Sequence, residues 1–181
     1  RGIAVCNTPG VLSAAVADLT IGMIITASRG LIPNAAFVRE GGWAKREPAP
    51  GLGWDLAGKT LGLIGFGRIG RAVAERARAF GMRVIYHDIV PKLPMGNARP
   101  TDTLEDLLKE ADFVSLHVPE TPETKNLIGE NEIGAMRKGS YLLNASRGTV
   151  VVIPALVAGL RSGRLAGAAV APPALAPERI P

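Results

Sequence analysis

One stretch decides the fold, Leu61-Gly62-Leu63-Ile64-Gly65-Phe66-Gly67-Arg68-Ile69-Gly70. It joins a short apolar run to three glycines spaced G-x-G-x-x-G, and a helical pattern follows from Ile69 to Phe80. A second apolar run, Arg83-Val84-Ile85-Tyr86, ends close to Asp88, eighteen residues after Gly70. A strand, a tight turn, a helix, a strand and an acid in this order are typical of a dinucleotide-binding unit.

Each member of this pattern has a physical reason. Gly65 permits the sharp turn out of the strand, Gly67 lets the backbone approach a pyrophosphate, and Gly70 lets the helix pack tightly on the sheet. The helix N-terminus offers N–H groups and partial positive charge to phosphates. Asp88 can accept hydrogen bonds from both hydroxyls of an adenosine ribose and would repel a 2′-phosphate, so we expect NAD rather than NADP. A glycine-rich turn in an unrelated α/β domain is the alternative, which the flanking pattern disfavours.

Composition narrows the class of protein and of partner. Of the 181 residues 47% are apolar and 20% charged, as in soluble globular domains. No apolar run reaches the roughly 18 to 20 residues of a membrane span, and no signal peptide is evident, so we expect no membrane partner. The single cysteine, Cys6, fits a reducing compartment, and we expect a cytoplasmic location.

The excess of basic over acidic residues does not indicate a nucleic-acid partner. The net charge is +5, but the basic residues are scattered and aromatic residues make up only 4% of the chain. Without a stacking platform we expect no nucleic-acid partner, and a mild positive field suits anionic substrates. No Cys/His cluster has the spacing of metal ligands, so we expect no metal.

Strands and helices alternate along the chain, which predicts an α/β fold with a Rossmann-type, doubly wound parallel sheet. The predicted strands are residues 2–6, 61–64, 83–86, 112–118, 140–145 and 165–170. The predicted helices are residues 11–28, 34–40, 69–80, 103–109, 129–136 and 154–161. Gly41-Gly42-Trp43 is expected to break the second helix, and residues 44–53 and 89–99 are expected to be loops. The first helix is apolar nearly all round, so we expect it to be buried between domains or subunits.

Parallel strands bring their carboxyl ends to one crevice, where ligands bind. Four ends are expected there: Gly65-Phe66-Gly67, Asp88, His117-Val118-Pro119 and Ala145-Ser146-Arg147. The Arg147 guanidinium can hold a carboxylate by two parallel hydrogen bonds and polarise a neighbouring carbonyl; a surface arginine is the alternative. His117 can donate to a cofactor or act as an acid, with a packing role as the alternative. No partner for a hydrolytic triad is evident at Ser146.

These residues resemble the NAD-dependent D-isomer-specific 2-hydroxyacid dehydrogenases. Two stretches carry the resemblance: the glycine fingerprint with Tyr86-His87-Asp88, and residues 142–151 with Arg147. Residues 88–98, 115–119 and 146–156 are most similar to the D-3-phosphoglycerate dehydrogenase branch of the family.

The resemblance implies roles for individual residues. Arg68 and Ile69 would contact the pyrophosphate, and Arg147, the expected catalytic residue, would bind the substrate carboxylate. Val118 and residues 145–147 would line the nicotinamide side. The complete set of expected cofactor-binding residues is Gly65, Gly67, Arg68, Ile69, Gly70, Asp88, His117, Val118, Pro119, Ala145, Ser146 and Arg147.

The resemblance also implies an organisation of the chain. Residues 1–9 would be a remnant of a substrate domain that is largely missing, and residues 10–170 an NAD-binding domain. Helix 11–28 would cross between subunits of a dimer, so we expect a homo-oligomer, and residues 171–181 would form an irregular tail. The catalytic histidine is expected beyond residue 181, and its glutamate near Ala176, two residues before Glu178. The family usually has Asp at Val152 and Ala171. We therefore expect this chain to bind NAD and to turn over slowly or not at all.

The expected reaction is hydride transfer between NAD and a small 2-hydroxy or 2-oxo acid. The resemblance favours oxidation of 3-phosphoglycerate to 3-phosphohydroxypyruvate, a step of serine biosynthesis. A glyoxylate or hydroxypyruvate reductase of the same family remains open. So does an NAD-sensing interaction module without turnover, since the family resembles the C-terminal-binding-protein co-repressors.

Overall fold

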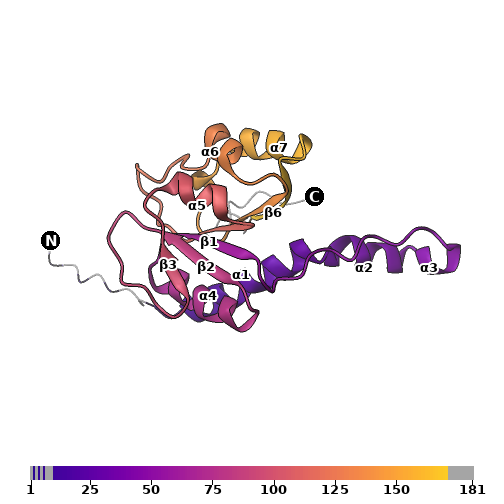
Figure 1. The fold of residues 1–181 in the computed structure, drawn as a ribbon, viewed down its shortest axis with the longest axis horizontal. Coiled ribbons are helices and arrows are strands. Elements are labelled where there is room, and N and C mark those ends of the chain that lie inside the picture. The colour runs from indigo at the N-terminus through magenta and orange to yellow at the C-terminus, as the bar shows by residue number, and fades with distance from the viewer. Residues whose placement is uncertain (1, 3, 5, 7–9, 171–181) are drawn as a thin grey trace.

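Six parallel strands form one sheet in the order β3-β2-β1-β4-β5-β6 (Figure 1). The structure is a computed structural model, and it describes residues 2, 4, 6 and 10–170. The order reverses between β1 and β4, the point at which a doubly wound sheet binds its ligand. The predicted Rossmann-type fold is therefore confirmed. The strands are β1 Thr60–Ile64, β2 Arg83–His87, β3 Ala98–Pro100, β4 Phe113–Leu116, β5 Ser140–Asn144 and β6 Leu165–Val170.

Helices cover both faces of the sheet, as Figure 1 shows. Helices α1 (Ser13–Ser28) and α4 (Arg68–Ala79) lie on one face, and α5 (Leu104–Glu110), α6 (Glu130–Ala135) and α7 (Ile153–Arg161) on the other. Successive side chains of a strand point to opposite faces, so Leu63 joins the core under α1 and Ile64 the core under α5. The central strands are buried on both faces, which explains their continuous apolar runs.

Most predicted helices are confirmed within two residues at each end. A capping box starts α5: Thr103 Oγ1 accepts from the backbone N–H of Asp106, and the Asp106 carboxylate accepts from the backbone N–H of Thr103. Helix α1 buries Ala17, Ile21 and Ile24 against α4 and the sheet. Its opposite side is exposed in the single chain, so its burial between domains or subunits stays a prediction.

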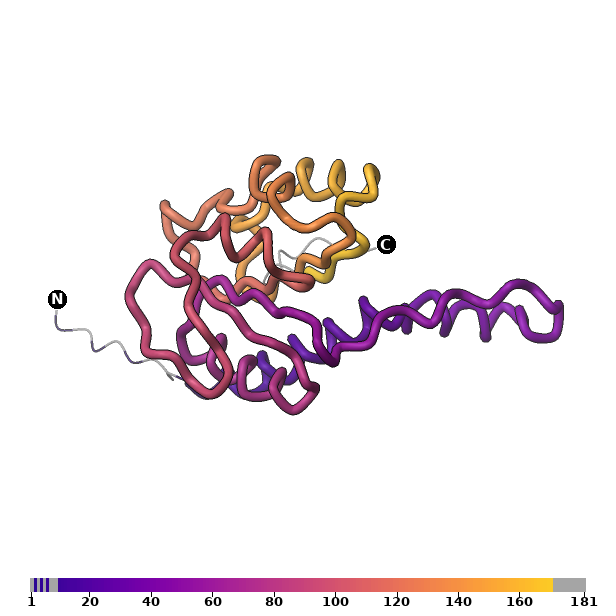
Figure 2. The backbone as a smooth tube through the Cα atoms, viewed as in Figure 1, coloured from indigo at the N-terminus to yellow at the C-terminus, as the bar shows by residue number. Residues whose placement is uncertain are grey.

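Residues 31–52 form an arm that projects from the domain, and Figure 2 shows the chain running out and back along it. Two predictions were wrong here. Helix α2 (Leu31–Arg39) starts before Pro33, because proline is tolerated in a first helical turn. The glycine pair ends the second helix as predicted, but a short helix, α3 (Gly42–Lys45), takes the place of the first residues of the predicted loop; a Cβ on Gly42 would lie 2.2 Å from the ring of Phe37.

The base of the arm is pinned to the end of α1. The backbone N–H of Trp54 donates to the carbonyl of Ser28 at 2.8 Å, and Arg29 pairs with Asp55 at 2.7 Å. A Cβ on Gly53 would lie 2.1 Å from the Ser28 carbonyl oxygen, so the returning chain passes there only as glycine. The arm therefore leaves the domain at one fixed point.

The loop predicted at residues 89–99 contains a strand, β3, which was missed. Three residues pair with β2 in parallel, and the Asn97 side chain donates to the Met82 carbonyl at 2.8 Å. Such a short edge strand, ending in Pro100, has too little alternation to be recognised from sequence.

Two predicted segments lie wholly or mostly outside the described residues. These are the strand at residues 2–6 and the tail at residues 171–181, with Ala171, Ala176 and Glu178. Among the described residues no single helix is long and apolar enough to span a membrane. Helices α1 and α2 would meet that test only as a pair, and a bend of 61° separates them.

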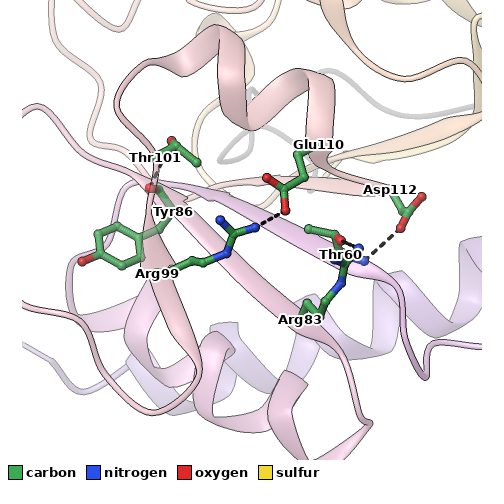
Figure 3. A network of polar contacts seen from close by, with 7 residues as sticks. All are labelled: Thr60, Arg83, Tyr86, Arg99, Thr101, Glu110 and Asp112. Atoms are coloured by element: carbon green, nitrogen blue, oxygen red, sulfur yellow. Dashed lines mark hydrogen bonds and ion pairs between the residues drawn. The ribbon is translucent and has the colours of Figure 1, made fainter.

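Polar side chains hold the amino ends of the strands together (Figure 3). Asp112, nearly buried just before β4, accepts from the backbone N–H of Thr60 in β1 at 2.9 Å and from Arg137 at 2.9 Å. Arg83 of β2 donates to the Thr60 hydroxyl at 2.6 Å, and Arg99 of β3 pairs with Glu110. This network lies at the edge opposite the strand ends that carry the predicted site.

Asp112 should therefore matter for stability. Asp112→Ala leaves the buried Thr60 N–H without an acceptor, and should lower the free energy of unfolding in urea by about 2 kcal/mol. Asp112→Asn keeps an acceptor oxygen for Thr60 and should cost clearly less. Equal losses in the two variants would show that the Thr60 bond contributes nothing.

Candidate functional site

A cleft of about 410 Å³ opens at the carboxyl ends of β1, β2 and β4. Six of the predicted cofactor-binding residues line it: Gly65, Gly67, Asp88, His117, Val118 and Pro119. Ile89, Leu104 and Leu127 add apolar walls. A mostly apolar cleft with an acid at one end fits a flat aromatic base joined to a sugar.

The glycine turn has the shape that a pyrophosphate requires. Gly65 has φ +93°, and a Cβ there would lie 2.4 Å from the carbonyl oxygen of His117. A Cβ on Gly70 would lie 2.3 Å from the Gly65 carbonyl oxygen, so α4 approaches the turn closely. Apart from Gly67 and its two neighbours in the chain, no atom of the described residues lies within 4 Å of a Cβ built on Gly67, which leaves that position open to a ligand.

The N-terminus of α4 faces this open position. Its N-cap residue, Gly67, supplies no side-chain cap, so the first backbone N–H groups of the helix remain available to an anion. The Arg68 side chain is exposed beside them, whereas Ile69 packs on the core. The residues present therefore fit a dinucleotide, with Arg68 as an additional positive charge and Ile69 as an anchor of the helix.

Asp88 has a structural task besides the predicted one. One carboxylate oxygen accepts from the backbone N–H of Phe66 at 2.8 Å, and the other accepts from Val90 at 2.9 Å. A carboxylate offers about four acceptor positions, so about two remain for the hydroxyls of a ribose. Asp88 thus braces the glycine turn and keeps acceptor capacity toward the cleft.

An aromatic pair supports the same turn from beneath. The Phe66 ring is buried and stacks on Tyr86 of β2, with ring centroids 3.8 Å apart and 7° between the planes. Burial raises the pKa of Tyr86, whose hydroxyl donates to the Lys92 carbonyl at 2.8 Å. The first two strand ends are therefore fixed to each other by stacking as well as by the Asp88 bonds.

Ser146 connects the ends of β5 and β4. Its hydroxyl donates to the carbonyl of Leu116 at 2.7 Å and accepts from the backbone N–H of Val118 at 3.0 Å. Both bonds are internal, so the Ser146 side chain and the Val118 N–H are already occupied. Ser146 and Val118 can therefore contact a ligand only through their other atoms.

Asn144 is a site residue that sequence reasoning missed. It is buried at the end of β5, where its amide nitrogen donates to the Arg147 carbonyl at 2.8 Å and its oxygen accepts from the Ser146 N–H at 2.9 Å. These bonds fold the chain into the turn that presents Arg147. A polar residue closing a buried apolar strand was the signal that could have found it.

Arg147 projects from this turn and is exposed. Its guanidinium donates to the adjacent Ser146 carbonyl at 3.2 Å, and it has no acidic partner in the part of the chain that the structure describes. Ala145, before it, is half-buried. The guanidinium therefore retains most of its donors for an anionic ligand.

His117 lies just past β4, with Nε2 2.9 Å from the hydroxyl of Ser115. Burial lowers the pKa of His117 to about 4. At neutral pH the ring is uncharged and therefore a poor proton donor in catalysis, so a role in binding or packing fits better.

The loop after β4 contributes Thr121, Glu123 and Thr124 to the cleft, and none of them was predicted. The loop is held by local bonds, such as that from the Thr124 hydroxyl to the Pro119 carbonyl at 2.6 Å. No group of three or more His, Cys, Asp or Glu residues is arranged to hold a metal ion among the described residues.

Comparison with known proteins places the chain among dehydrogenases. Residues 21–171 match the family model described as D-isomer specific 2-hydroxyacid dehydrogenase, NAD binding domain. The D-3-phosphoglycerate dehydrogenase of Dictyostelium discoideum is 49% identical over 94% of this chain and 41% of its own length. The glyoxylate reductase of Thermococcus litoralis is 47% identical over 93% of this chain and 53% of its own length.

A solved structure has the same fold. The TT0316 protein of Thermus thermophilus has a TM-score of 0.88 and 48% identity, over 99% of this chain and 56% of that one. The chain thus spans between 36% and 53% of the length of its first three curated relatives.

Acid unfolding tests the burial of His117. The unfolded chain binds a proton at the ordinary pKa of 6.5, but the folded chain does so only near 4, so stability falls as the pH drops from 6.5 toward 4. The free energy of unfolding in urea falls between pH 7 and about 4.5, and His117→Gln should make this fall smaller by about 2 kcal/mol. An equal reduction in the control variant His87→Gln would contradict this assignment.

Proposed function

The chain belongs to the D-isomer specific 2-hydroxyacid dehydrogenase family, and we propose that it supports hydride transfer between NAD and a small 2-hydroxy acid. One observation carries this proposal. The acid after β2, the open glycine turn after β1 and the arginine after β5 lie along one edge of the sheet. This order matches the sequence ribose, pyrophosphate and reacting end along an extended dinucleotide.

Binding is divided among a few groups of this chain. Asp88 accepts from the adenosine ribose, and the uncapped start of α4 with Arg68 holds the pyrophosphate. When NAD is bound, its nicotinamide supplies the hydride acceptor or donor. The protein contributes orientation, charge and exclusion of water.

Arg147 is proposed as the residue that meets the substrate. Its planar guanidinium holds the carboxylate of a 2-hydroxy acid by two parallel hydrogen bonds and stabilises negative charge that develops on the neighbouring oxygen. The hydrogen bonds of Asn144 hold the backbone of this turn, so the point at which the Arg147 side chain leaves the backbone is fixed.

We propose 3-phosphoglycerate as the substrate, oxidised to 3-phosphohydroxypyruvate in serine biosynthesis. Support comes from relatives named D-3-phosphoglycerate dehydrogenase in Dictyostelium discoideum and Escherichia coli, at 49% and 48% identity. The second candidate is reduction of glyoxylate or hydroxypyruvate, favoured by the glyoxylate reductase of Thermococcus litoralis at 47% identity.

A substrate panel with an Arg147 variant tests both parts of this proposal. With NADH and the complete parent protein, phosphohydroxypyruvate should be reduced with a higher kcat/KM than glyoxylate or hydroxypyruvate. Arg147→Ala should lower kcat/KM by about 100-fold or more, because the carboxylate contact is lost in the transition state, while NADH affinity stays within about threefold.

Each other outcome of this panel has a definite meaning. A preference for glyoxylate would assign the reductase activity instead. NADH binding without turnover of any of the three acids would contradict the enzyme proposal and favour an NAD-sensing module.

We further propose a homodimer formed through helix α1 and the arm. One side of α1 is buried in the domain, and the other presents Leu12 and Leu19, each more than half exposed. The arm continues this surface with Ile32, Trp43 and Leu52, which are 70% exposed or more. Exposed apolar side chains gathered on neighbouring elements are typical of a partner surface.

Light scattering coupled to gel filtration tests the dimer. The chain should elute with twice the mass of the protomer, and Leu19→Glu should shift it toward the monomer, because a buried charge is costly at an interface. Val157→Glu, on the exposed side of α7, is the matched control and should leave the mass unchanged. A monomeric parent chain would refute the proposal.

A further inference from the structure

A buried ring nitrogen at the end of β4 has no hydrogen-bond partner in the part of the chain that the structure describes. His117 and Ser115 are two residues apart, so their side chains share one side of the strand, and Nε2 of the ring lies 2.9 Å from the serine oxygen. Nδ1, the other ring nitrogen, is buried and has no hydrogen-bond partner among the described residues. One nitrogen of the ring therefore has a hydrogen-bond partner, and the other has none.

The arrangement of protons follows from counting donors and acceptors. Ser115 is fully buried, and His117 is its sole hydrogen-bond partner among the described residues. If Nε2 carried the ring proton, two buried groups would be unpaired: the serine hydroxyl proton would have no acceptor, and Nδ1 would have no donor. If the hydroxyl instead donates to Nε2, only the Nδ1 proton is left over. The second arrangement leaves fewer buried groups unpaired and is favoured.

His117 also belongs to the cleft in which a ligand would bind. The residue lines the same cleft as Gly65 and Asp88, at the reversal point of strand order between β1 and β4. Its carbonyl oxygen touches the glycine turn, and its N–H donates to the Ile64 carbonyl at 2.8 Å. The backbone of His117 is therefore fixed, and a dinucleotide lying across this edge brings ribose and phosphate oxygens, which are acceptors, beside it.

We propose that Nδ1–H of His117 donates a hydrogen bond to an oxygen of the bound dinucleotide, and that the Ser115 hydroxyl holds the ring in this tautomer. His117 is then a binding residue, and Ser115 a positioning residue that acts through it. The inference rests on the proposed binding of NAD at this edge.

Nitrogen NMR of the imidazole rings tests the proposal directly, because the chain has only two histidines. Between about pH 5.5 and 8, His117 should stay neutral with its proton on Nδ1. Saturation with NAD should shift the Nδ1 and Nδ1–H signals and slow exchange of that proton with water.

The outcomes separate this inference from the proposed function. NAD binding with an unchanged Nδ1–H signal, or a ring proton on Nε2 in the free protein, would overturn the role of His117 and leave NAD binding intact. Failure to bind NAD at all would overturn both.

Variants supply an independent readout, with NAD affinity measured by calorimetry. His117→Phe keeps a ring but removes the donor, and should weaken NAD binding by about tenfold. His117→Gln retains an N–H donor and should recover part of the loss, which a merely packing histidine would not predict. Ser115→Ala should produce a mixture of tautomers in the spectrum and an intermediate affinity.

Ser140→Ala is the matched control for Ser115→Ala. Ser140 is buried like Ser115, but its hydroxyl has no hydrogen-bond partner among the described residues, and it lies at the opposite edge of the sheet, where β5 begins. NAD affinity should not change in this variant. Equal weakening by both serine variants would show that the effect of Ser115 is one of general packing, and would contradict the proposal.

Discussion

The site depends on one close approach, that of Gly65 to the end of β4. A side chain at this position would lie 2.4 Å from the carbonyl oxygen of His117, and its φ of +93° is one that few other residues adopt. Because the chain turns so sharply there, α4 begins directly above the sheet edge with its first N–H groups uncapped. The same turn brings the Phe66 N–H to the carboxylate of Asp88. One missing Cβ thus sets the direction of the helix and the place of the acid.

Side-chain bonds between strand ends then make the site one unit. Asp88 connects the end of β2 to the turn after β1, and Ser146 connects the turn after β5 to the end of β4. Asn144 folds the β5 turn on itself and so places Arg147. At the far edge, Asp112 performs a comparable task between β1 and β4. The strands are fixed at both ends, and the ligand side is left with unpaired donors and acceptors.

Patterns of regular spacing made most of this fold predictable from the sequence. Apolar runs identified every strand of the described sheet except β3, and the helix predicted at residues 103–109 lies within one residue of α5 at each end. The failures have physical causes. The short helix α3 depends on a contact between Phe37 and the space left by Gly42, which no local pattern reports. The task of Ser146 depends on the Leu116 carbonyl, which is thirty residues away in the chain.

The central claim is that the edge containing Asp88 and the glycine turn binds NAD in preference to NADP. Calorimetric titration of the chain with each dinucleotide tests it most directly. Asp88→Ala is the variant, and Asp102→Ala, which replaces an exposed acid, is the control. The account predicts that NAD binds at least about tenfold more tightly than NADP, because the carboxylate accepts from the ribose hydroxyls and repels a 2′-phosphate. Asp88→Ala should remove most of that preference, and Asp102→Ala none of it. Equal affinity for the two dinucleotides in the unaltered chain would contradict the account.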